Sequence, residues 1–241
     1  AEKYFGRKSV QMANCLSYAG WAKKSTGEYK IAEQLLTEAK YNCEQAVGKG
    51  HPDCLICVND LSSLYSDICR FAESEHLFLE TKKTAEQFFG KESSDYARSI
   101  NNLAVLYTSM GRLEEAESFY LEHKKIREKN PGKHSIDYGR SANNLGNFYH
   151  FVGRLQDSEQ LLVEAKNIWS ELLGNENPLY ATSLNNLAGV FIDEKKFLEA
   201  KSLLIEANNI RLKKLGNEHP DYAISLNNLG HLYQRIEQID S

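Results

Sequence analysis

The stretch Ser99-Ile100-Asn101-Asn102-Leu103-Ala104-Val105-Leu106-Tyr107 contains a tripeptide that returns along the chain. Asn-Asn-Leu stands at residues 101–103, 143–145, 185–187 and 227–229, with a spacing of 42 residues each time. A variant, Asn59-Asp60-Leu61, stands one period earlier. A glycine, a glutamate and a small residue share this period: Gly6, Gly48, Gly90, Gly132, Gly174 and Gly216; Glu38, Glu80, Glu122, Glu164 and Glu206; Ala32, Ser74, Ala116, Ser158 and Ala200. Four series in one register predict a chain built from structural repeats.

Each period contains the pattern of two helices. One face of a first helix is marked by Ile100, Leu103, Ala104 and Tyr107, at i, i+3, i+4 and i+7. After a turn at residues 110–112, the apolar face of a second helix is marked by Leu113, Ala116, Phe119 and Tyr120. The series glycine follows this helix, where a left-handed C-cap favours a residue without a Cβ atom. No useful stretch alternates with period two, so the sequence predicts an all-α fold of about eleven helices.

These residues carry a resemblance to a known family. The chain resembles the tetratricopeptide repeat, whose core pattern of large, Leu, small, Tyr, Ala and aromatic residues is matched by Ile100, Leu103, Ala104, Tyr107, Ala116 and Tyr120. The usual period of that motif is about 34 residues. The longer period here, with Leu-Asn-Asn-Leu at 184–187 and 226–229 and a Leu-Gly-x-x-His-Pro-Asp loop at 215–221, resembles the kinesin light chain type of repeat. The resemblance implies an α-solenoid, a right-handed superhelix of antiparallel helix pairs.

The register divides the chain into repeats of one solenoid segment, residues 1–241. The repeats are predicted at about 13–54, 55–96, 97–138, 139–180 and 181–222, with partial repeats at 1–12 and 223–241. Phe5-Gly6 aligns with Phe89-Gly90, which places the start of the chain at the tail of a second helix. Neither end carries an obvious polar capping helix, which a free-standing solenoid needs. We therefore expect a segment of a longer protein.

Composition and motifs exclude several functions. The net charge is −4 with both signs dispersed, which argues against bulk electrostatic binding to nucleic acid. No apolar run is long enough to span a membrane. No phosphate-binding loop, zinc-protease helix or nucleophile elbow is present. The recurring glutamates indicate a structural role, accepting hydrogen bonds between neighbouring repeats. The segment is therefore predicted not to be an enzyme and to need no cofactor, while a catalytic domain elsewhere in the full protein stays open.

The cysteines raise the question of a metal site. Cys43, Cys54, Cys57 and Cys69 lie near His51 in the sequence, and thiolates with an imidazole are ligands for zinc. The repeat register favours packing instead. Cys57 aligns with Ser99, Ser141, Ser183 and Ser225; Cys54 aligns with Tyr96, Tyr138, Tyr180 and Tyr222; Cys69 aligns with Gly27, Gly111 and Gly153. The odd count of five and the lack of a secretion signal predict reduced, metal-free cysteines in a cytoplasmic protein.

The resemblance implies that the first helices line the concave side of the solenoid. With Leu103 and Tyr107 in the core, one neighbouring stripe of side chains faces the groove. The candidate groove residues are Asn59, Arg98, Asn101, Arg140, Asn143, Asn147, His150, Asn185 and Asn227. An asparagine side chain has a donor and an acceptor, so a ladder of them can satisfy the backbone of an extended peptide. In kinesin light chain repeats the corresponding asparagines contact bound peptide. The next series, Asn102, Asn144, Asn186 and Asn228, is expected to join repeat to repeat, and some of the first series is open to the same role.

Two functions follow from this pattern. The first is a protein–protein interaction module that binds a peptide or partner domain in the groove and docks onto a larger complex. Arg98 and Arg140 share one position, which either forms a cationic step for an acidic partner or is simply solvated. The second is a sensing arm that controls an effector outside the segment, such as a caspase-like CHAT protease or a nucleotide-switch ATPase. No membrane partner is expected, and direct binding of nucleic acid is not expected.

Overall fold

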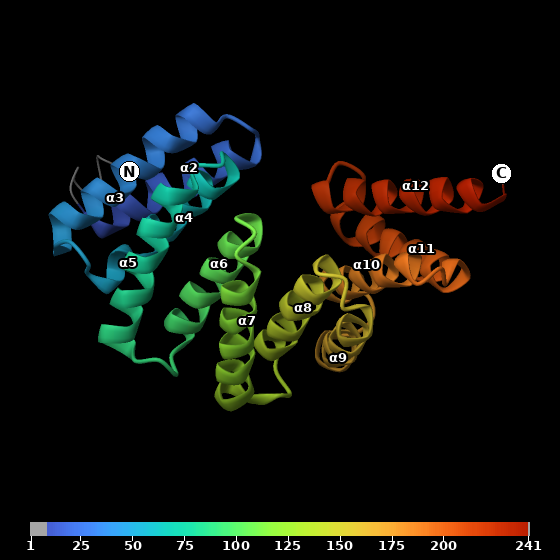
Figure 1. Cartoon of the computed structure of the whole chain (residues 1–241). Helices are drawn as coiled ribbons and strands as arrows, with labels where there is room; N and C mark the ends of the chain where they lie inside the picture. The colour runs from blue at the N-terminus through green and yellow to red at the C-terminus, as the bar shows by residue number, and fades with distance from the viewer. Residues whose placement is uncertain (1–8, 241) are drawn as a thin grey trace. The chain divides into compact units, whose positions relative to one another are not determined.

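The computed structural model describes residues 9–240, with side chains as far as residue 237 (Figure 1). The predicted tail of a second helix at Phe5-Gly6 lies outside the described residues.

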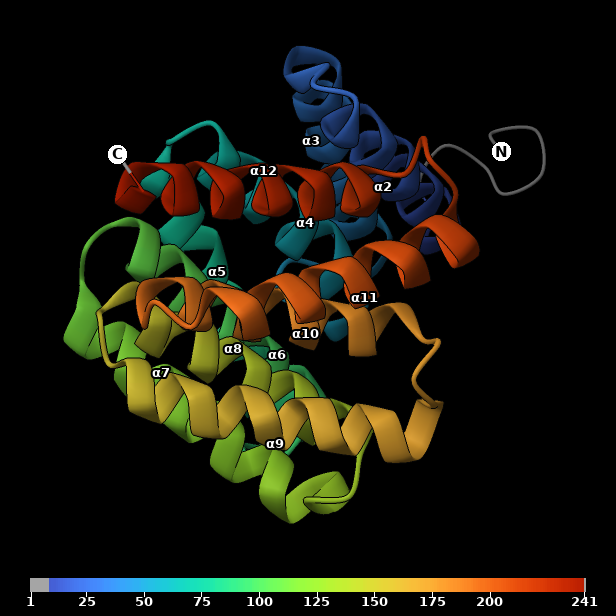
Figure 2. The same cartoon turned by 90° about the vertical axis from the view of Figure 1, so that its right-hand side faces the viewer.

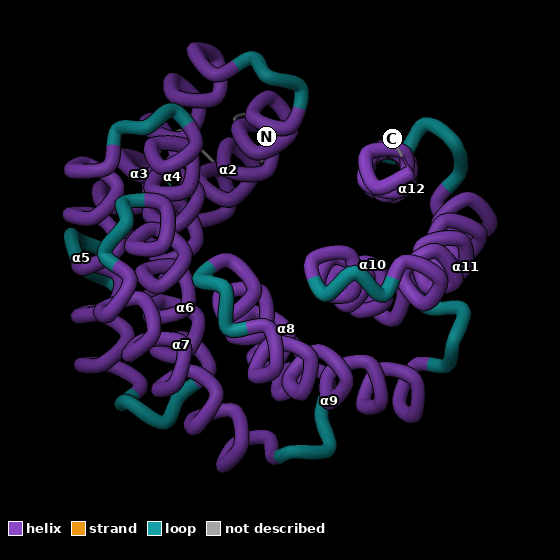
Figure 3. The backbone as a smooth tube through the Cα atoms, turned by 45° about the vertical axis from the view of Figure 1, so that its right-hand side comes forward, coloured by secondary structure: helices purple, strands orange, loops and turns teal. Residues whose placement is uncertain are grey.

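The described residues form eleven α-helices that alternate as first and second members of helix pairs (Figure 3). The first helices are α2 (Val10–Ser25), α4 (Leu55–Asp67), α6 (Ser94–Ser109), α8 (Ile136–Phe151), α10 (Pro178–Asp193) and α12 (Pro220–Asp240). The second helices are α3 (Tyr29–Val47), α5 (Phe71–Phe89), α7 (Leu113–Arg127), α9 (Leu155–Leu173) and α11 (Phe197–Leu215). A 3₁₀ turn, η1 (Pro52–Cys54), precedes α4, and a π-helical turn, η2 (Glu128–Gly132), precedes α8. The predicted all-α repeat solenoid is confirmed.

The chain divides into two compact units. Unit 1 comprises residues 1–126 and contains helices α2 to α7, and unit 2 comprises residues 127–241 and contains helices α8 to α12. Each unit is a stack of helix pairs and is described by itself.

Local sequence signals set the helix boundaries. The Ser93 hydroxyl accepts a hydrogen bond from the backbone N–H of Tyr96 at 3.2 Å, which caps the start of α6. Gly90 ends α5 with φ of 79°, a backbone conformation that side chains with a Cβ rarely adopt. Between the helices of each pair, Cys69 (φ 60°) and Lys195 (φ 62°) occupy the turn position held elsewhere by glycine. The register that aligned Cys69 with turn glycines is therefore confirmed.

The core of each unit lies between the helices of a pair and between neighbouring pairs. In unit 1, Ile100, Leu103 and Ala104 are fully buried, and in unit 2 Trp169 and Leu184 are buried. The small-residue series is fully buried at every repeat: Ala32, Ser74, Ala116, Ser158 and Ala200. A small side chain at this position lets the two helices of a pair approach each other. Within the described part of the chain, no helix is both long and apolar enough to cross a lipid bilayer.

Three members of the glutamate series accept hydrogen bonds from the first helix of their own helix pair. The donors are tyrosine hydroxyls on first helices, and the bonds are Tyr96 to Glu122 at 3.0 Å, Tyr138 to Glu164 at 2.8 Å and Tyr180 to Glu206 at 3.3 Å. By the predicted repeat bounds, each tyrosine ends one repeat and its glutamate lies in the next, so these three bonds join neighbouring predicted repeats as expected. In the structure, the offset of 26 residues joins the first helix to the second helix of the same pair.

Cys43 and Cys54 form a disulfide with their Cα atoms 5.6 Å apart, so the prediction that all five cysteines are reduced is wrong. The reason lies in the register. Cys43 stands one period before Ala85, Cys54 stands one period before Tyr96, and Ala85 and Tyr96 pack in one cluster. The two repeat positions that Ala85 and Tyr96 occupy one period later are therefore both occupied by cysteine here. Disulfides persist in oxidising compartments, so the cytoplasmic, reducing location expected from the cysteine count loses its basis.

Candidate functional site

The first helices of each unit present a stripe of polar and apolar side chains, which we call the first-helix face. It consists of the predicted groove residues and their repeat equivalents. In each unit this face contains a hollow between first helices, and the two hollows are described in turn.

The unit 1 hollow lies over α4 and α6 and has a volume of about 310 Å³. It is lined by Ile56, Asn59, Asp60, Ser63, Ser66, Asp67, Phe78, Arg98, Asn102, Val105 and Leu106. Two of the predicted groove residues of unit 1, Asn59 and Arg98, are therefore brought together here. The third, Asn101, is half-buried on α6 and does not line the hollow.

Several side chains of this hollow already have partners. Asn102 Nδ2 donates a hydrogen bond to Asn59 Oδ1 at 3.3 Å, which joins α6 to α4. Arg98 donates to Asp95 at 2.5 Å, three residues earlier on the same helix. The first bond confirms for Asn102 the expectation that the second asparagine series joins repeats, and it shows that Asn59 takes part in the same contact.

Asp60 is the acidic member of the second asparagine series, and it lines this hollow. It stands where Asn102 stands in the next repeat, and it is half-buried. Burial raises the pKa of Asp60 to about 6, while Lys24, the Ser17 hydroxyl and Arg98 act in the opposite direction. Among the described residues Asp60 forms no ion pair. The hollow therefore contains a carboxylate that Lys24 and Arg98 attract but that no cation of the described residues approaches to ion-pair distance.

The unit 2 hollow has a volume of about 260 Å³ and is lined by residues of α8, α10 and α12. Figure 2 shows these three first helices of the unit. The lining residues are Asn147, His150, Asn185, Asn186, Gly189, Ile192, Asp193, Asn228 and His231. Three of the predicted groove residues, Asn147, His150 and Asn185, are brought together here. Asn227 is exposed on α12 outside the hollow, and Arg140 is exposed on α8 with its guanidinium 4.0 Å from Asp137.

The two central asparagines of unit 2 differ in their bonding. Asn143 and Asn185 occupy the same repeat position and are each 6% exposed. Asn143 Oδ1 accepts a hydrogen bond from Asn186 Nδ2 at 2.9 Å, which joins α8 to α10. Asn185 Oδ1 is buried and has no hydrogen-bond partner. Because Asn228, in the position equivalent to Asn186, donates nothing to it, Asn185 keeps an unpaired acceptor at the hollow.

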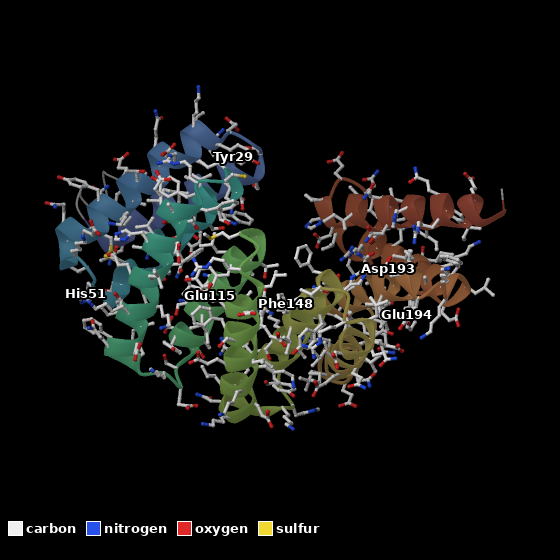
Figure 4. All side chains as sticks on the ribbon, in the orientation of Figure 1. Tyr29, His51, Glu115, Phe148, Asp193 and Glu194 are labelled. Atoms are coloured by element: carbon white, nitrogen blue, oxygen red, sulfur yellow. A yellow bond between two sulfur atoms is a disulfide. The ribbon has the colours of Figure 1, made fainter. Side chains whose placement is uncertain are left out.

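A histidine–aspartate pair crosses the same hollow. His150 Nε2 lies 2.8 Å from Asp193 Oδ2, at the end of α10, where Asp193 is labelled in Figure 4. A Cβ atom at Gly189 would come within 3.1 Å of His150 Cε1, so the glycine leaves room for the imidazole. We did not predict Asp193 from the sequence. The signal was present, because His150 and Asp193 are separated by 43 residues, the same offset as the Asn59–Asn102 and Asn143–Asn186 pairs.

Sequence reasoning also missed two exposed aromatic residues on α2. Tyr18 is 70% exposed and Trp21 is 59% exposed. Trp21 stands one period before Ser63, which lines the unit 1 hollow, so the aromatic pair belongs to the first-helix face of unit 1. The repeat alignment would have placed it there. No group of three or more His, Cys, Asp or Glu side chains in the described part of the chain is arranged to hold a metal ion.

Comparisons with known proteins agree with the repeat architecture. Two family models, both described as the tetratricopeptide repeat, match the chain, one over residues 12–53 and the other over residues 54–129, 137–207 and 181–241. No curated protein sequence matches.

Solved structures share the fold at low sequence identity. BtubC (BKLC) from P. vanneervenii has a TM-score of 0.66 and 23% identity, over 88% of this chain and 90% of that one. A putative kinesin light chain from Podospora anserina with nearly identical repeats has a TM-score of 0.66 and 20% identity, over 86% and 99% of the two chains. A signal transduction ATPase with numerous domains (STAND), carrying a tetratricopeptide repeat sensor, from Pyrococcus horikoshii has a TM-score of 0.64 and 16% identity, over 94% of this chain and 35% of that one.

Proposed function

Because this chain belongs to the tetratricopeptide repeat family, whose members generally mediate protein–protein interaction, we propose that it is a binding module that holds a polypeptide segment on its first-helix face. The fold of this family is typically non-catalytic, and we assign no reaction to these residues.

The observation that carries this proposal is the unpaired Asn185 Oδ1 in the unit 2 hollow. A buried acceptor without a partner costs about 1–3 kcal/mol, and folded proteins keep few such groups. A backbone N–H of a bound segment supplies the missing donor. The side chains of Asn147, Asn228 and His231 line the same hollow and offer further donors and acceptors. Such a surface recognises the backbone of a polypeptide and makes few demands on its side chains.

The two arginines of the first-helix face are not equivalent in this proposal. Arg98 is hydrogen-bonded to Asp95 at 2.5 Å, so an acidic ligand would have to displace that carboxylate. Arg140 lies 4.0 Å from Asp137, at the limit of an ion pair, and is well exposed. The acidic partner expected from the sequence is therefore proposed for the surface around Arg140 alone.

The proposal is tested with short random peptides displayed on phage and selected against the immobilised protein. Enriched peptides should lose about fivefold in affinity on Asn185→Ala, the loss of one hydrogen bond of about 1 kcal/mol. Asn208→Ala is the matched control, because Asn208 Oδ1 is also buried without a partner but lies on the second helix α11, away from the hollow.

Charge reversal on the second helices tests whether they, and not the first helices, form the binding surface. If no peptide is enriched, or if Lys124→Glu or Lys166→Glu abolishes binding while Asn185→Ala leaves it unchanged, the first-helix face is not the binding surface. The array would then be a scaffold that partners contact through its second helices.

The structural match to a STAND ATPase that carries a tetratricopeptide repeat sensor supports a second candidate function. In it, the segment is the sensing arm of a longer protein, and binding on the first-helix face controls an effector domain. This candidate predicts a phosphate-binding loop or a Cys–His protease pattern in the full-length sequence. It further predicts that Asn185→Ala uncouples the effector from its signal without changing its basal activity.

A further inference from the structure

One position breaks the asparagine scheme of the repeats. The second asparagine series is Asn102, Asn144, Asn186 and Asn228, and the equivalent residue in the repeat before Asn102 is Asp60. Ser17 stands one period before Asn59, so the residue that an asparagine at position 60 would contact is a serine here. An amide that joins repeats elsewhere is thus replaced by a carboxylate beside a hydroxyl.

The other charges around the unit 1 hollow are paired. Lys24, on α2, places its Nζ 2.9 Å from Asp67 Oδ2 and 2.6 Å from Ser63 Oγ. Arg98, on α6, is held by Asp95. Lys24 and Arg98 therefore balance Asp67 and Asp95, and Asp60 is left as one negative charge in excess.

The walls of the hollow suit a long aliphatic side chain. Ile56 on α4 is 40% exposed and Val105 on α6 is 47% exposed, and both line the hollow together with Phe78. Lysine and arginine bury their methylene stems against apolar surface while the charged end reaches a partner. A carboxylate in the same place would meet Asp60 and Asp67.

We propose that the unit 1 hollow binds a lysine or arginine side chain of a polypeptide segment held on the first-helix face of unit 1, with its charged end paired to Asp60 and its stem against Ile56 and Val105. This inference rests on the proposed function, since it names a side chain that the bound segment carries. An ion pair at a half-buried carboxylate is stronger than one in open solvent because less water screens it.

Protonation of Asp60 gives the pairing a pH dependence. Lys24 on α2, Asp67 and Cys57 on α4, Ser17 on α2 and Arg98 on α6 are the polar and charged groups that face it. A raised pKa of about 6 means that the free carboxyl is mostly ionised at pH 7.5 and mostly protonated at pH 5. Since only the carboxylate attracts a cation, binding is tightest above pH 7 and weakens as the pH falls through 6.

The test compares the wild type with Asp60→Asn, which introduces the residue that four other repeats carry and so preserves the fold. Random peptides on phage are selected against the wild type and depleted against Asp60→Asn. The surviving peptides should share a lysine or arginine. Replacing that residue with glutamine in the synthetic peptide should weaken binding to the wild type about tenfold at pH 7.5, and much less at pH 5 or on Asp60→Asn.

Each result separates this inference from the proposed function. If selected peptides depend on Asn185 but none is lost on Asp60→Asn, the lysine or arginine site is refuted and the binding module stands. If Asp60→Asn lowers the affinity equally for the lysine peptide and for its glutamine version, the inference is also overturned, because the effect of Asp60 then does not depend on the charge of the peptide residue. If no peptide is enriched on the wild type, the proposed function fails first and this inference fails with it.

Discussion

Replacing Asn143 or Asn185 by alanine should have different effects on stability, although the two asparagines look identical in the sequence. They share a repeat position, a unit and an exposed fraction of 6%. Their difference is one hydrogen bond, from Asn186 Nδ2 to Asn143 Oδ1 at 2.9 Å, which Asn185 lacks. The gain in helix propensity and the loss of side-chain volume are the same for both substitutions, so they cancel in the comparison.

The magnitude follows from what each substitution leaves behind. Asn143→Ala removes the bond and leaves the half-buried amide of Asn186 without its acceptor, which costs about 1–2 kcal/mol. Asn185→Ala breaks no bond and removes an unpaired buried acceptor, whose burial itself costs about 1 kcal/mol or more. We therefore expect Asn143→Ala to be less stable than Asn185→Ala by about 2–3 kcal/mol, with Asn185→Ala at least as stable as the wild type.

Urea unfolding followed by circular dichroism measures this difference on the whole chain, without ligand. Repeat arrays need not unfold in one step, so the comparison uses the same transition in both variants. Asn208→Ala, with the same kind of unpaired oxygen on α11, should behave like Asn185→Ala. Equal losses for Asn143→Ala and Asn185→Ala would refute the reasoning, because the hydrogen bond would then contribute nothing.

Three further predictions concern packing, the disulfide and charge. Ala116→Leu should lower the free energy of unfolding by about 1–3 kcal/mol, since the site is fully buried; an unchanged urea midpoint would show that the repeat register is wrong. Thiol titration of the denatured, unreduced protein should find three free cysteines, and titration after reduction should find five; five thiols without reductant would contradict the disulfide. Reduction of the Cys43–Cys54 disulfide should lower the free energy of unfolding of unit 1 by about 2–3 kcal/mol. Asp60→Asn should stabilise the fold by about 1–2 kcal/mol above pH 7, because ionisation of this half-buried carboxyl opposes folding. The gain should disappear below about pH 4, where the carboxyl is protonated in the folded and the unfolded state. A gain that does not depend on pH would exclude charge as its cause.

The sequence alone could predict the helices and turns because their causes are local and recur. Apolar residues at helical spacing, glycines after the second helices and small residues between helices each act within a few residues of their position. The turn at Cys69 shows how far this reasoning reaches. A cysteine there is unfavourable by itself, yet the register with Gly27 and Gly111 predicts the left-handed backbone that it adopts.

The disulfide was missed because its cause is a contact between two repeat positions. Each cysteine, compared with its own equivalents, looks like a packing residue. The contact becomes visible only when Cys43 is paired with Cys54 as Ala85 is with Tyr96. Comparing the positions in pairs, at the distance that separates neighbouring helices, would have indicated the bond.

The bonding of the candidate groove residues could be predicted only in part, because it too depends on contacts between two repeat positions. The sequence identifies the stripe on which Asn143 and Asn185 lie, but a side chain on this stripe is bonded or free according to the residue 43 positions further on. Asn143 meets Asn186 and is satisfied, whereas Asn185 is followed by an asparagine that donates nothing to it. At Asp60 a carboxylate has replaced the amide of the scheme, and no cation of the described residues lies within ion-pair distance of it. In a repeat protein, the positions at which both hydrogen-bonding partners are present hold neighbouring helices together. Where the scheme is incomplete, a polar group remains that only water or a partner can satisfy, and it is at these positions that we expect binding to be most sensitive to substitution.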